Sequence, residues 1–195
     1  IRDITVNIQN HRSGIIINMA NEQYEQSVNK WRQEVDANIR RENGWLALSG
    51  LFWLRKGTNL IGSNPDGDII LPKRAPALLG TFEFNGDNVT LNVEDNTPVE
   101  VNGTQTRSAL LDADREDVPS FITFNEIRMV VVRRSKGVGI RIWDNTRQER
   151  RSFPSRQWFP VKETMRIAAT YTHFETPKIV KMPDILGAIL DEPMQ

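Results

Sequence analysis

The sequence has 195 residues, and its 25 Lys and Arg balance 25 Asp and Glu, so we expect no nucleic acid among its partners. It contains no cysteine, which excludes disulfides, thiol nucleophiles and thiolate metal sites. Because no apolar run approaches the roughly 20 residues of a transmembrane helix, we expect no membrane span.

The charges are unevenly distributed along the sequence. Residues 83–126 hold ten acids and two bases, whereas residues 128–166 hold eleven bases and three acids. The basic part is a candidate surface for an anionic ligand or partner. The alternative is that strands of the two parts lie side by side and pair their charges. The residues considered for the basic surface are Arg133, Arg134, Lys136, Arg141, Arg147, Arg150, Arg151 and Arg156.

The N-terminal part of the sequence predicts an arm followed by a helix. Residues 1–20 alternate only weakly between apolar and polar and predict an extended arm. Residues 21–43 have the period of an amphipathic helix, with Asn21 as a suitable N-cap and Asn43-Gly44 as a suitable stop. Its apolar stripe consists of Tyr24, Val28, Trp31, Val35 and Ile39.

Residues 44–145 predict short strands separated by turn signals, which is typical of an antiparallel sandwich or barrel. The clearest hairpin has Asn85-Gly86 as its turn. We expect the helix to pack on this sandwich and Trp31, Trp45 and Trp53 to share one core. Residues 146–195 predict a short C-terminal β segment that begins a further lobe. The predicted strands are 60–61, 68–71, 81–84, 89–93, 99–101, 121–124, 127–133 and 138–143.

A combination of motifs identifies a first resemblance. These are Trp31-Arg32, the run from Gly44 to Leu54, Gly57-x-Asn59-x-x-Gly62-Ser63, Ile70-Leu71-Pro72, Gly139-Ile140-Arg141-Ile142-x-Asp144 and Arg156-x-Trp158-Phe159-Pro160-Val161. Together they resemble the uncharacterised prokaryotic domain-of-unknown-function family sixteen eighty-four over roughly residues 28–190. Members usually continue with a strand-rich segment that includes a Thr-Gly-x-x-Thr-Tyr element. The resemblance therefore implies that an active site in that segment would be missing here.

The sequence leaves the compartment open. It begins with Ile1 rather than methionine, so we expect a processed or trimmed N-terminus. The protein is then either cytoplasmic or exported after removal of a signal peptide.

A second resemblance covers residues 57–103, which look like a forkhead-associated (FHA) phosphopeptide-binding domain. In that fold an Arg after the second glycine and a Ser-Arg-x-x-His turn recognise phosphate. Here Ser63 replaces the Arg, and residues 73–80 contain neither that Ser nor that His, although Asn102 and Gly103 match. Serine cannot replace the bidentate phosphate contacts of Arg. The resemblance thus implies an FHA-like sandwich without phosphothreonine binding.

Other motifs are weak. Ser27 and Lys30 match a Ser-x-x-Lys acyl-transfer pair but lie off the apolar stripe, on a face expected to be solvated. The only histidines are His11 and His173, too few for a three-histidine metal site. The oxygen-rich residues 64–68 lack the later Glu of a calcium loop and fit turn chemistry. We expect no metal and no cofactor.

The candidate ligand-binding residues lie on motif positions of the first resemblance: Arg141, Asp144, Arg156, Trp158 and Arg166. We expect the first four to lie close together at one end of the β structure and to bind a carboxylate or phosphate. The alternative is a buried Arg–Asp pair that only fixes two strands.

The fold class that we predict is mainly β: an FHA-like antiparallel sandwich, one preceding amphipathic helix and a short C-terminal β segment. The favoured function is a non-catalytic binding or interaction domain for a protein or a small anionic ligand. The alternative is an enzyme, a hydrolase, whose site lies at the Arg/Asp/Trp cluster or in the missing C-terminal segment.

Overall fold

The computed structural model describes residues 22–167, 169–170, 173–184 and 187–194, so the expected arm at residues 1–20 lies outside the described residues. The chain divides into two compact units. One comprises Ile1–Ile39, Pro154–Thr176 and Gln195, and the other comprises Arg40–Phe153 and Pro177–Met194. Each unit is described by itself below.

The N-terminal helix is helical over residues 22–40 in the described part of the chain. Tyr24, Val28, Val35 and Ile39 of the predicted stripe are half-buried. Asn43 has a left-handed backbone with a φ of 56°, the conformation that commonly follows a helix end. The predicted stop after this helix is therefore confirmed.

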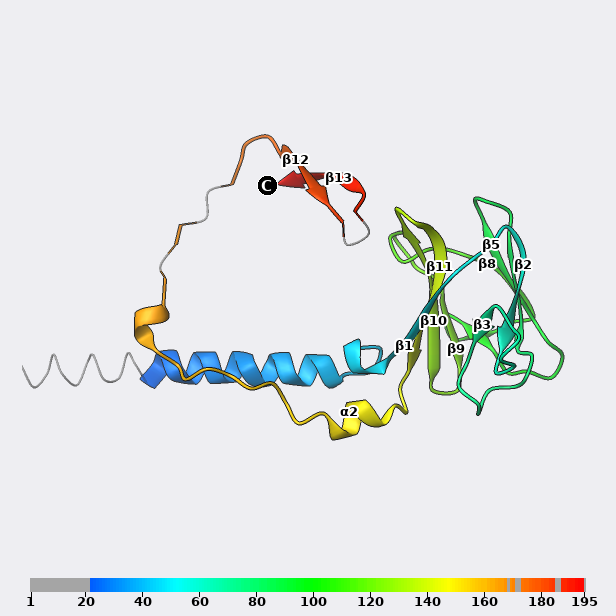
Figure 1. The fold of residues 1–195 in the computed structure, drawn as a ribbon, viewed down its shortest axis with the longest axis horizontal. Coiled ribbons are helices and arrows are strands. Elements are labelled where there is room, and N and C mark those ends of the chain that lie inside the picture. Colours follow the sequence, from blue (N-terminus) through cyan, green and yellow to red (C-terminus); the bar gives the residue numbers. More distant parts are fainter. Residues whose placement is uncertain (1–21, 168, 171–172, 185–186, 195) are drawn as a thin grey trace, which may run out of the picture. The chain divides into compact units, whose positions relative to one another are not determined.

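Two β-sheets form the second unit's main body, and the predicted mainly β sandwich is confirmed (Figure 1). Neighbouring strands pair antiparallel except β2 and β3, which are parallel. The first sheet has the order β1 (Leu48–Trp53), β11 (Gly137–Asp144), β10 (Ile127–Arg134), β9 (Phe121–Phe124), β6 (Glu100–Val101) and β7 (Thr104–Gln105). The second has the order β3 (Ile69–Ile70), β2 (Gly57–Gly62), β4 (Gly80–Phe84), β5 (Val89–Val93) and β8 (Ser108–Leu111).

Short helices and a hairpin complete the described elements. They are the 3-10 turns η1 (Trp45–Ala47) and η2 (Glu163–Met165), the helix α2 (Gln148–Ser152), and the antiparallel strands β12 (Lys178–Pro183) and β13 (Ile189–Met194). The last two strands confirm the predicted C-terminal β segment. In the described ranges, no helix combines the length and apolar character required to cross a membrane.

The hairpin of β4 and β5 has the predicted turn and register. Phe84 lies opposite Val89, and Phe82 lies opposite Leu91. The Asn85 side-chain oxygen accepts hydrogen bonds from the backbone N–H groups of Asp87 and Asn88, at 2.9 and 2.7 Å. Gly86 adopts a φ of 111°, which a side chain would disfavour.

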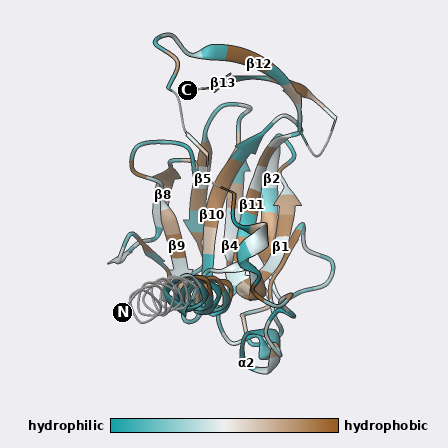
Figure 2. Ribbon diagram, turned by 90° about the vertical axis from the view of Figure 1, so that its left-hand side faces the viewer, coloured by the Kyte–Doolittle hydropathy of each residue, from teal (hydrophilic) through white to brown (hydrophobic). Residues whose placement is uncertain are grey.

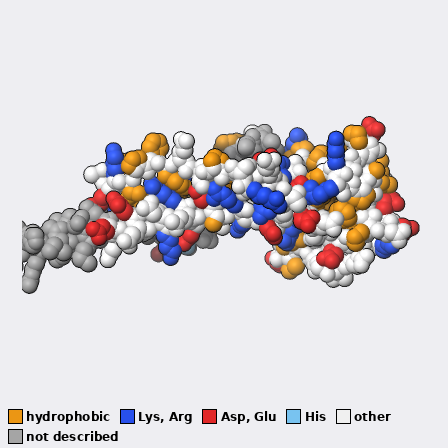
Figure 3. All heavy atoms as spheres, turned by 90° about the horizontal axis from the view of Figure 1, so that it is seen from below, with side chains coloured by type: hydrophobic (Ala, Val, Ile, Leu, Met, Phe, Trp, Pro, Cys, Tyr) orange, Lys and Arg blue, Asp and Glu red, His pale blue; other side chains and the backbone are white. Residues whose placement is uncertain are grey.

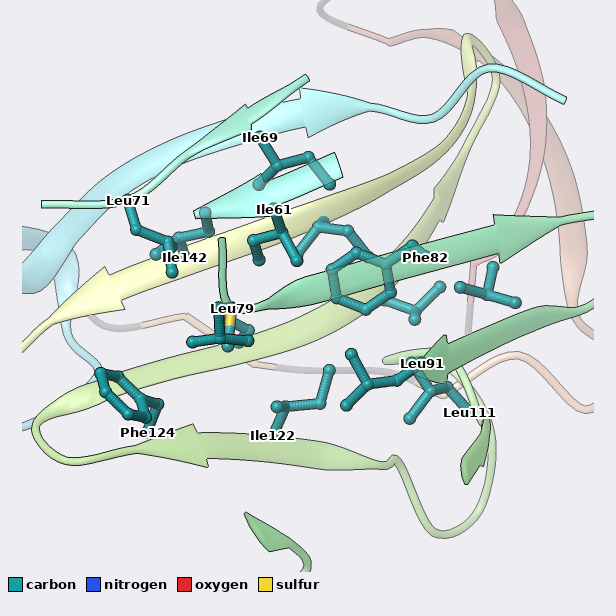
Figure 4. Close-up of a cluster of buried hydrophobic side chains, with 14 of the residues drawn as sticks. Ile61, Ile69, Leu71, Leu79, Phe82, Leu91, Leu111, Ile122, Phe124 and Ile142 are labelled. Carbon is teal, nitrogen blue, oxygen red and sulfur yellow. The ribbon is translucent and has the colours of Figure 1, made fainter. Parts of the chain in front are cut away.

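The core lies between the two sheets, where apolar side chains of both point toward one another (Figure 4). Each sheet contributes alternate residues of its strands, as the period of two requires. Fully buried members of the core include Ile61, Leu79, Phe82 and Leu91 from the second sheet or its loops, and Ile122, Met129, Ile140 and Ile142 from the first. Figure 2 shows the hydrophobic stretches along these strands.

The predicted common core of three tryptophans is wrong. Trp45 lies in η1 and is 78% exposed, whereas Ala47 is the buried residue of that turn. In β1, Phe52 packs against the core, so strand alternation places Trp53 on the opposite face. There the Lys136 ammonium lies 5.4 Å from the Trp53 ring centroid.

Candidate functional site

The loops after β2 and β3, whose sequence was compared above with the FHA recognition loops, hydrogen-bond to one another. The Ser63 backbone N–H donates to the Pro76 carbonyl, and its hydroxyl donates to the Ala75 carbonyl, both at 2.8 Å. A Cβ on Gly62 would lie 2.1 Å from the Ala77 carbonyl oxygen, so the two loops are in direct contact. The hydroxyl of Ser63 therefore fixes the loop after β3.

The matching pair Asn102 and Gly103 forms the turn between β6 and β7. Both residues have a positive φ, of 51° and 79°. The Asn102 side-chain oxygen accepts a hydrogen bond from the Phe121 backbone N–H at 2.9 Å, which ties this turn to β9. Both residues thus have a structural role in the turn.

We expect that phosphothreonine peptides do not bind to these loops. The hydroxyl of Ser63 is already hydrogen-bonded and cannot offer the two parallel N–H donors of an arginine. Fluorescence polarisation with a degenerate phosphothreonine peptide library checks this expectation. Micromolar binding that disappears after phosphatase treatment would contradict it.

Asp144 ends β11 on its core side and forms an ion pair with Arg74, from the loop after β3. The guanidinium donates to both carboxylate oxygens, at 2.8 and 2.6 Å. Thr146 adds its backbone N–H at 2.8 Å and its hydroxyl at 2.7 Å. Burial raises the pKa of Asp144, but these hydrogen bonds outweigh it and lower the pKa to about 2. The carboxylate stays ionised at neutral pH.

This ion pair corrects the expected partnership of Asp144. Its bidentate partner is Arg74, whereas the sequence pointed to Arg141 or Arg156. Arg141 lies on the same strand, but Ile140 and Ile142 face the core, so alternation directs Arg141 to the opposite face. The pair of Arg74 and Asp144 links the loop after β3 to the end of β11, which is a structural role.

Arg141 projects from the outer face of the first sheet, which we define as the side turned away from the core. Its guanidinium lies 3.8 Å from the Asp114 carboxylate and 5.8 Å from the Trp143 ring centroid. Arg134 occupies both oxygens of Asp114, with hydrogen bonds of 3.0 and 2.5 Å. Burial raises the pKa of Asp114, but the hydrogen bonds and charge of Arg134 outweigh it, and the pKa is lowered.

Within the described part of the chain, the Arg141 guanidinium makes no hydrogen bond. Its side chain is 30% exposed, so it is partly desolvated and still in contact with solvent. Burial lowers the pKa of Arg141, the charge of Arg134 lowers it further, and Asp114 opposes both. Two guanidinium groups thus share one carboxylate, which leaves a surplus positive charge in this group of three side chains.

Arg128 lies on the same outer face, opposite Trp143 in the register of β10 and β11. Its guanidinium carbon lies 4.0 Å from the Phe121 ring centroid. The Nε atom is buried and, among the described residues, has no hydrogen-bond partner. The outer face therefore combines arginines with aromatic rings.

Arg156, Trp158 and Arg166 belong to the other unit. The structure brings two of them together, because the Arg156 guanidinium lies 5.8 Å from the Trp158 ring centroid. Trp31 meets the Trp158 ring edge-on at 5.3 Å, and Arg32 lies 5.4 Å from it. Arg166 stacks separately on Tyr24, at 5.4 Å.

Several arginines of the predicted basic surface bind backbone or acidic groups of the chain itself. Arg147 donates to the Leu48 carbonyl at 3.0 Å, and Arg150 donates to the Arg40 carbonyl at 3.1 Å. Arg133 donates to the Asp87 carbonyl, and Arg134 pairs with Asp114. In Figure 3 the Lys and Arg side chains are scattered among acidic and uncharged ones. The alternative of internal charge pairing therefore applies to Arg134.

The weaker motifs have local structural roles. Ser27 donates its hydroxyl to the Tyr24 carbonyl at 2.7 Å. Asn64 accepts a hydrogen bond from Asp66, and Asp68 accepts one from the Leu60 backbone, which fits a turn. No group of three or more His, Asp or Glu in the described ranges is arranged to hold a metal ion. A cavity of about 270 Å³ beside the β4–β5 turn, lined in part by Lys56 and Glu83, includes none of the predicted site residues.

No family model matches the sequence, and no curated protein matches it. The structure is similar to solved FHA domains at low identity. The FHA domain of FhaA, in complex with the intracellular domain of Rv3910, gives a TM-score of 0.35 and 17% identity over 47% of this chain and 85% of that one. The FHA domain of CT664 from Chlamydia trachomatis gives a TM-score of 0.32 and 18% identity over 47% of this chain and 81% of that one. The FHA1 domain of yeast Rad53 gives a TM-score of 0.26 and 15% identity over 64% of this chain and 75% of that one. The resemblance to family sixteen eighty-four stays a prediction.

Proposed function

We propose that the chain is a non-catalytic binding domain that takes a carboxylate or phosphate group of a ligand or protein partner at Arg141. The observation that carries this proposal is a partly buried guanidinium that makes no hydrogen bond to the described residues. A bound anion would accept two parallel hydrogen bonds from the Arg141 guanidinium. It would also neutralise the surplus positive charge of Arg141 and Arg134.

The surroundings of Arg141 favour binding by orienting its side chain. The guanidinium lies near the ring of Trp143 on the same strand, at a cation–π distance. Asp114 attracts it electrostatically from a distance too long for a hydrogen bond. Because Arg134 already engages both oxygens of Asp114, that carboxylate does not compete strongly for the donors of Arg141. Arg141 is thus held in place without being fully paired.

Asp144 gives no support to the alternative of a hydrolase. A carboxylate with a pKa of about 2 accepts a proton poorly at neutral pH, where a general base needs a pKa near the working pH.

The other unit holds a second group of arginines. An exposed guanidinium lies over an aromatic ring in two places there, Arg156 over Trp158 and Arg166 over Tyr24. We retain Arg156, Trp158 and Arg166 as a second candidate group for anions within that unit.

The proposal is tested by NMR titration of the whole chain with inorganic phosphate and, separately, with succinate. We expect shifts of the Arg141 guanidinium and Trp143 indole signals, and an affinity at least about tenfold weaker in Arg141→Gln, since a charge-assisted bidentate contact is lost. Arg151→Gln is the matched control, because Arg151 is an exposed arginine of α2. Absence of shifts in the unaltered chain, or equal binding by Arg141→Gln, would refute the proposal.

A further inference from the structure

The two sheets of the sandwich end in four edge strands, and one of them differs from the others. β3 and β7 have two residues each, and β8 has four. β1 has six and lies at the edge of its sheet next to β11 (Figure 2). Proteins protect their sheet edges with short strands, charges or proline, because an open edge pairs with other chains. β1 is the long edge strand of this sandwich.

β1 lacks charge and proline, and its register with β11 shifts only between Leu48 and Gly50, so the part from Gly50 to Trp53 is regular. Leu48–Trp53 contains no charged residue and no proline. Ser49 and Leu51 are exposed, and Leu51 is 41% exposed. One backbone group at the start of the strand is covered, since Arg147 donates to the Leu48 carbonyl. From Ser49 onward, the described residues provide a strand partner only on the β11 side.

The backbone direction shows which groups are available at this edge. The Leu54 N–H donates to the Val138 carbonyl at 2.9 Å, so it points toward β11. Successive residues of a strand alternate in direction. The N–H and C=O groups of Leu51 and Trp53 therefore point to the open edge, ready to accept another strand.

We propose that a second copy of this chain occupies the edge, with β1 of each copy antiparallel to the other about a two-fold axis at Leu51. Such an arrangement is self-complementary, as a two-fold interface requires. The exposed Leu51 side chain would meet its symmetry mate, and Trp53 would lie opposite Ser49 of the second copy. This proposal is independent of the anion site at Arg141.

The charges next to β1 favour this antiparallel pairing. Arg55 and Lys56 follow the strand directly. In a parallel arrangement each would face its own copy. Arg55 already pairs with Asp68 of its own chain, so the repulsion between like charges would arise mainly at Lys56. With the axis at Leu51, Arg55 lies opposite Ala47 and Lys56 opposite Leu46, so the cations of the two copies are separated. A single strand pair buries less surface than a standard interface, which makes a weak, reversible dimer the expected species.

Sedimentation equilibrium of the whole chain tests the proposal at protein concentrations from about 10 μM to about 1 mM, where a weak dimer would be detected. We expect a reversible monomer–dimer equilibrium whose dissociation constant rises at least about tenfold in Leu51→Lys, because lysine on an edge strand opposes pairing. Leu110→Lys is the matched control. Leu110 is 63% exposed on the edge strand β8, and its replacement should leave the dissociation constant unchanged.

Amide hydrogen exchange of the unaltered chain gives a second readout that needs no variant. The Leu51 and Trp53 amides should exchange more slowly as the protein concentration rises. A chain that stays monomeric at the highest concentration would overturn the proposal. So would a dimer that Leu51→Lys does not weaken, one that Leu110→Lys weakens equally, or binding of another protein at this edge in place of a second copy.

Discussion

Replacement of Phe82 with alanine is expected to destabilise the sandwich by about 3–5 kcal/mol, the range for a buried aromatic side chain. Phe82 is fully buried in β4, where it lies opposite Asn59 of β2 on one side and Leu91 of β5 on the other. Its ring fills the centre of the core between the two sheets (Figure 4). The free energy of unfolding from urea titration measures the effect.

Trp45→Ala is the control for this substitution. Trp45 has a larger side chain than Phe82, but it is 78% exposed. Its replacement should therefore change the free energy of unfolding by no more than about 0.5 kcal/mol. A loss below about 1 kcal/mol for Phe82→Ala, or a similar loss for both variants, would show that the core lies elsewhere.

The turns allowed most of the sandwich to be predicted from the sequence. Asn85-Gly86 and Lys136-Gly137 mark reversals that the structure shows, with Gly86 and Gly137 in left-handed conformations. Between such turns the period of two determines which side chains face the core. β10 and β11 extend the predicted segments by one or two residues, because hydrogen bonds between the two strands continue to the turn.

The local sequence pattern was insufficient to predict strands β7 and β8. Ser108–Leu111 lacks the alternation and the β-branched or aromatic residues of a typical strand, and it forms a strand because it pairs with β5. The aromatic run around β1 was also ambiguous, since Trp45, Phe52 and Trp53 are all large aromatic residues. Only the position of β1 next to β11 decides that Phe52 faces the core.

Sequence motifs pointed to Arg141 and Asp144 as candidates, but not to the residues that they contact. Arg74 is 70 positions from Asp144 in the sequence, and Asp114 is 20 positions from Arg134. These partners meet because of strand order, which no local spacing encodes. The strand alternation of residues 139–144 was the one signal available, since it already directs Arg141 and Asp144 to opposite faces.

Arg74→Met is expected to destabilise the chain by about 3 kcal/mol at neutral pH, because it leaves the carboxylate of Asp144 buried without its cation. Arg55→Met is the matched control. The side chain of Arg55 is 78% exposed in its ion pair with Asp68, and exposed pairs contribute less than about 1 kcal/mol. Urea titration compares the two variants, and equal losses would contradict the structural role of the buried pair.

The pH dependence of this ion pair is the last test. The fold lowers the pKa of Asp144 from 3.8 to about 2, so the folded state favours the ionised form. The resulting stabilisation is fully present above the unfolded pKa and is lost as the pH falls from 3.8 through about 2. The difference in unfolding free energy between the unaltered chain and Arg74→Met should therefore shrink across this window. Asp144→Asn, which cannot ionise, should lose less stability than the unaltered chain between these pH values. A difference that stays constant down to pH 2 would show that Arg74 acts through packing rather than through the charge of Asp144.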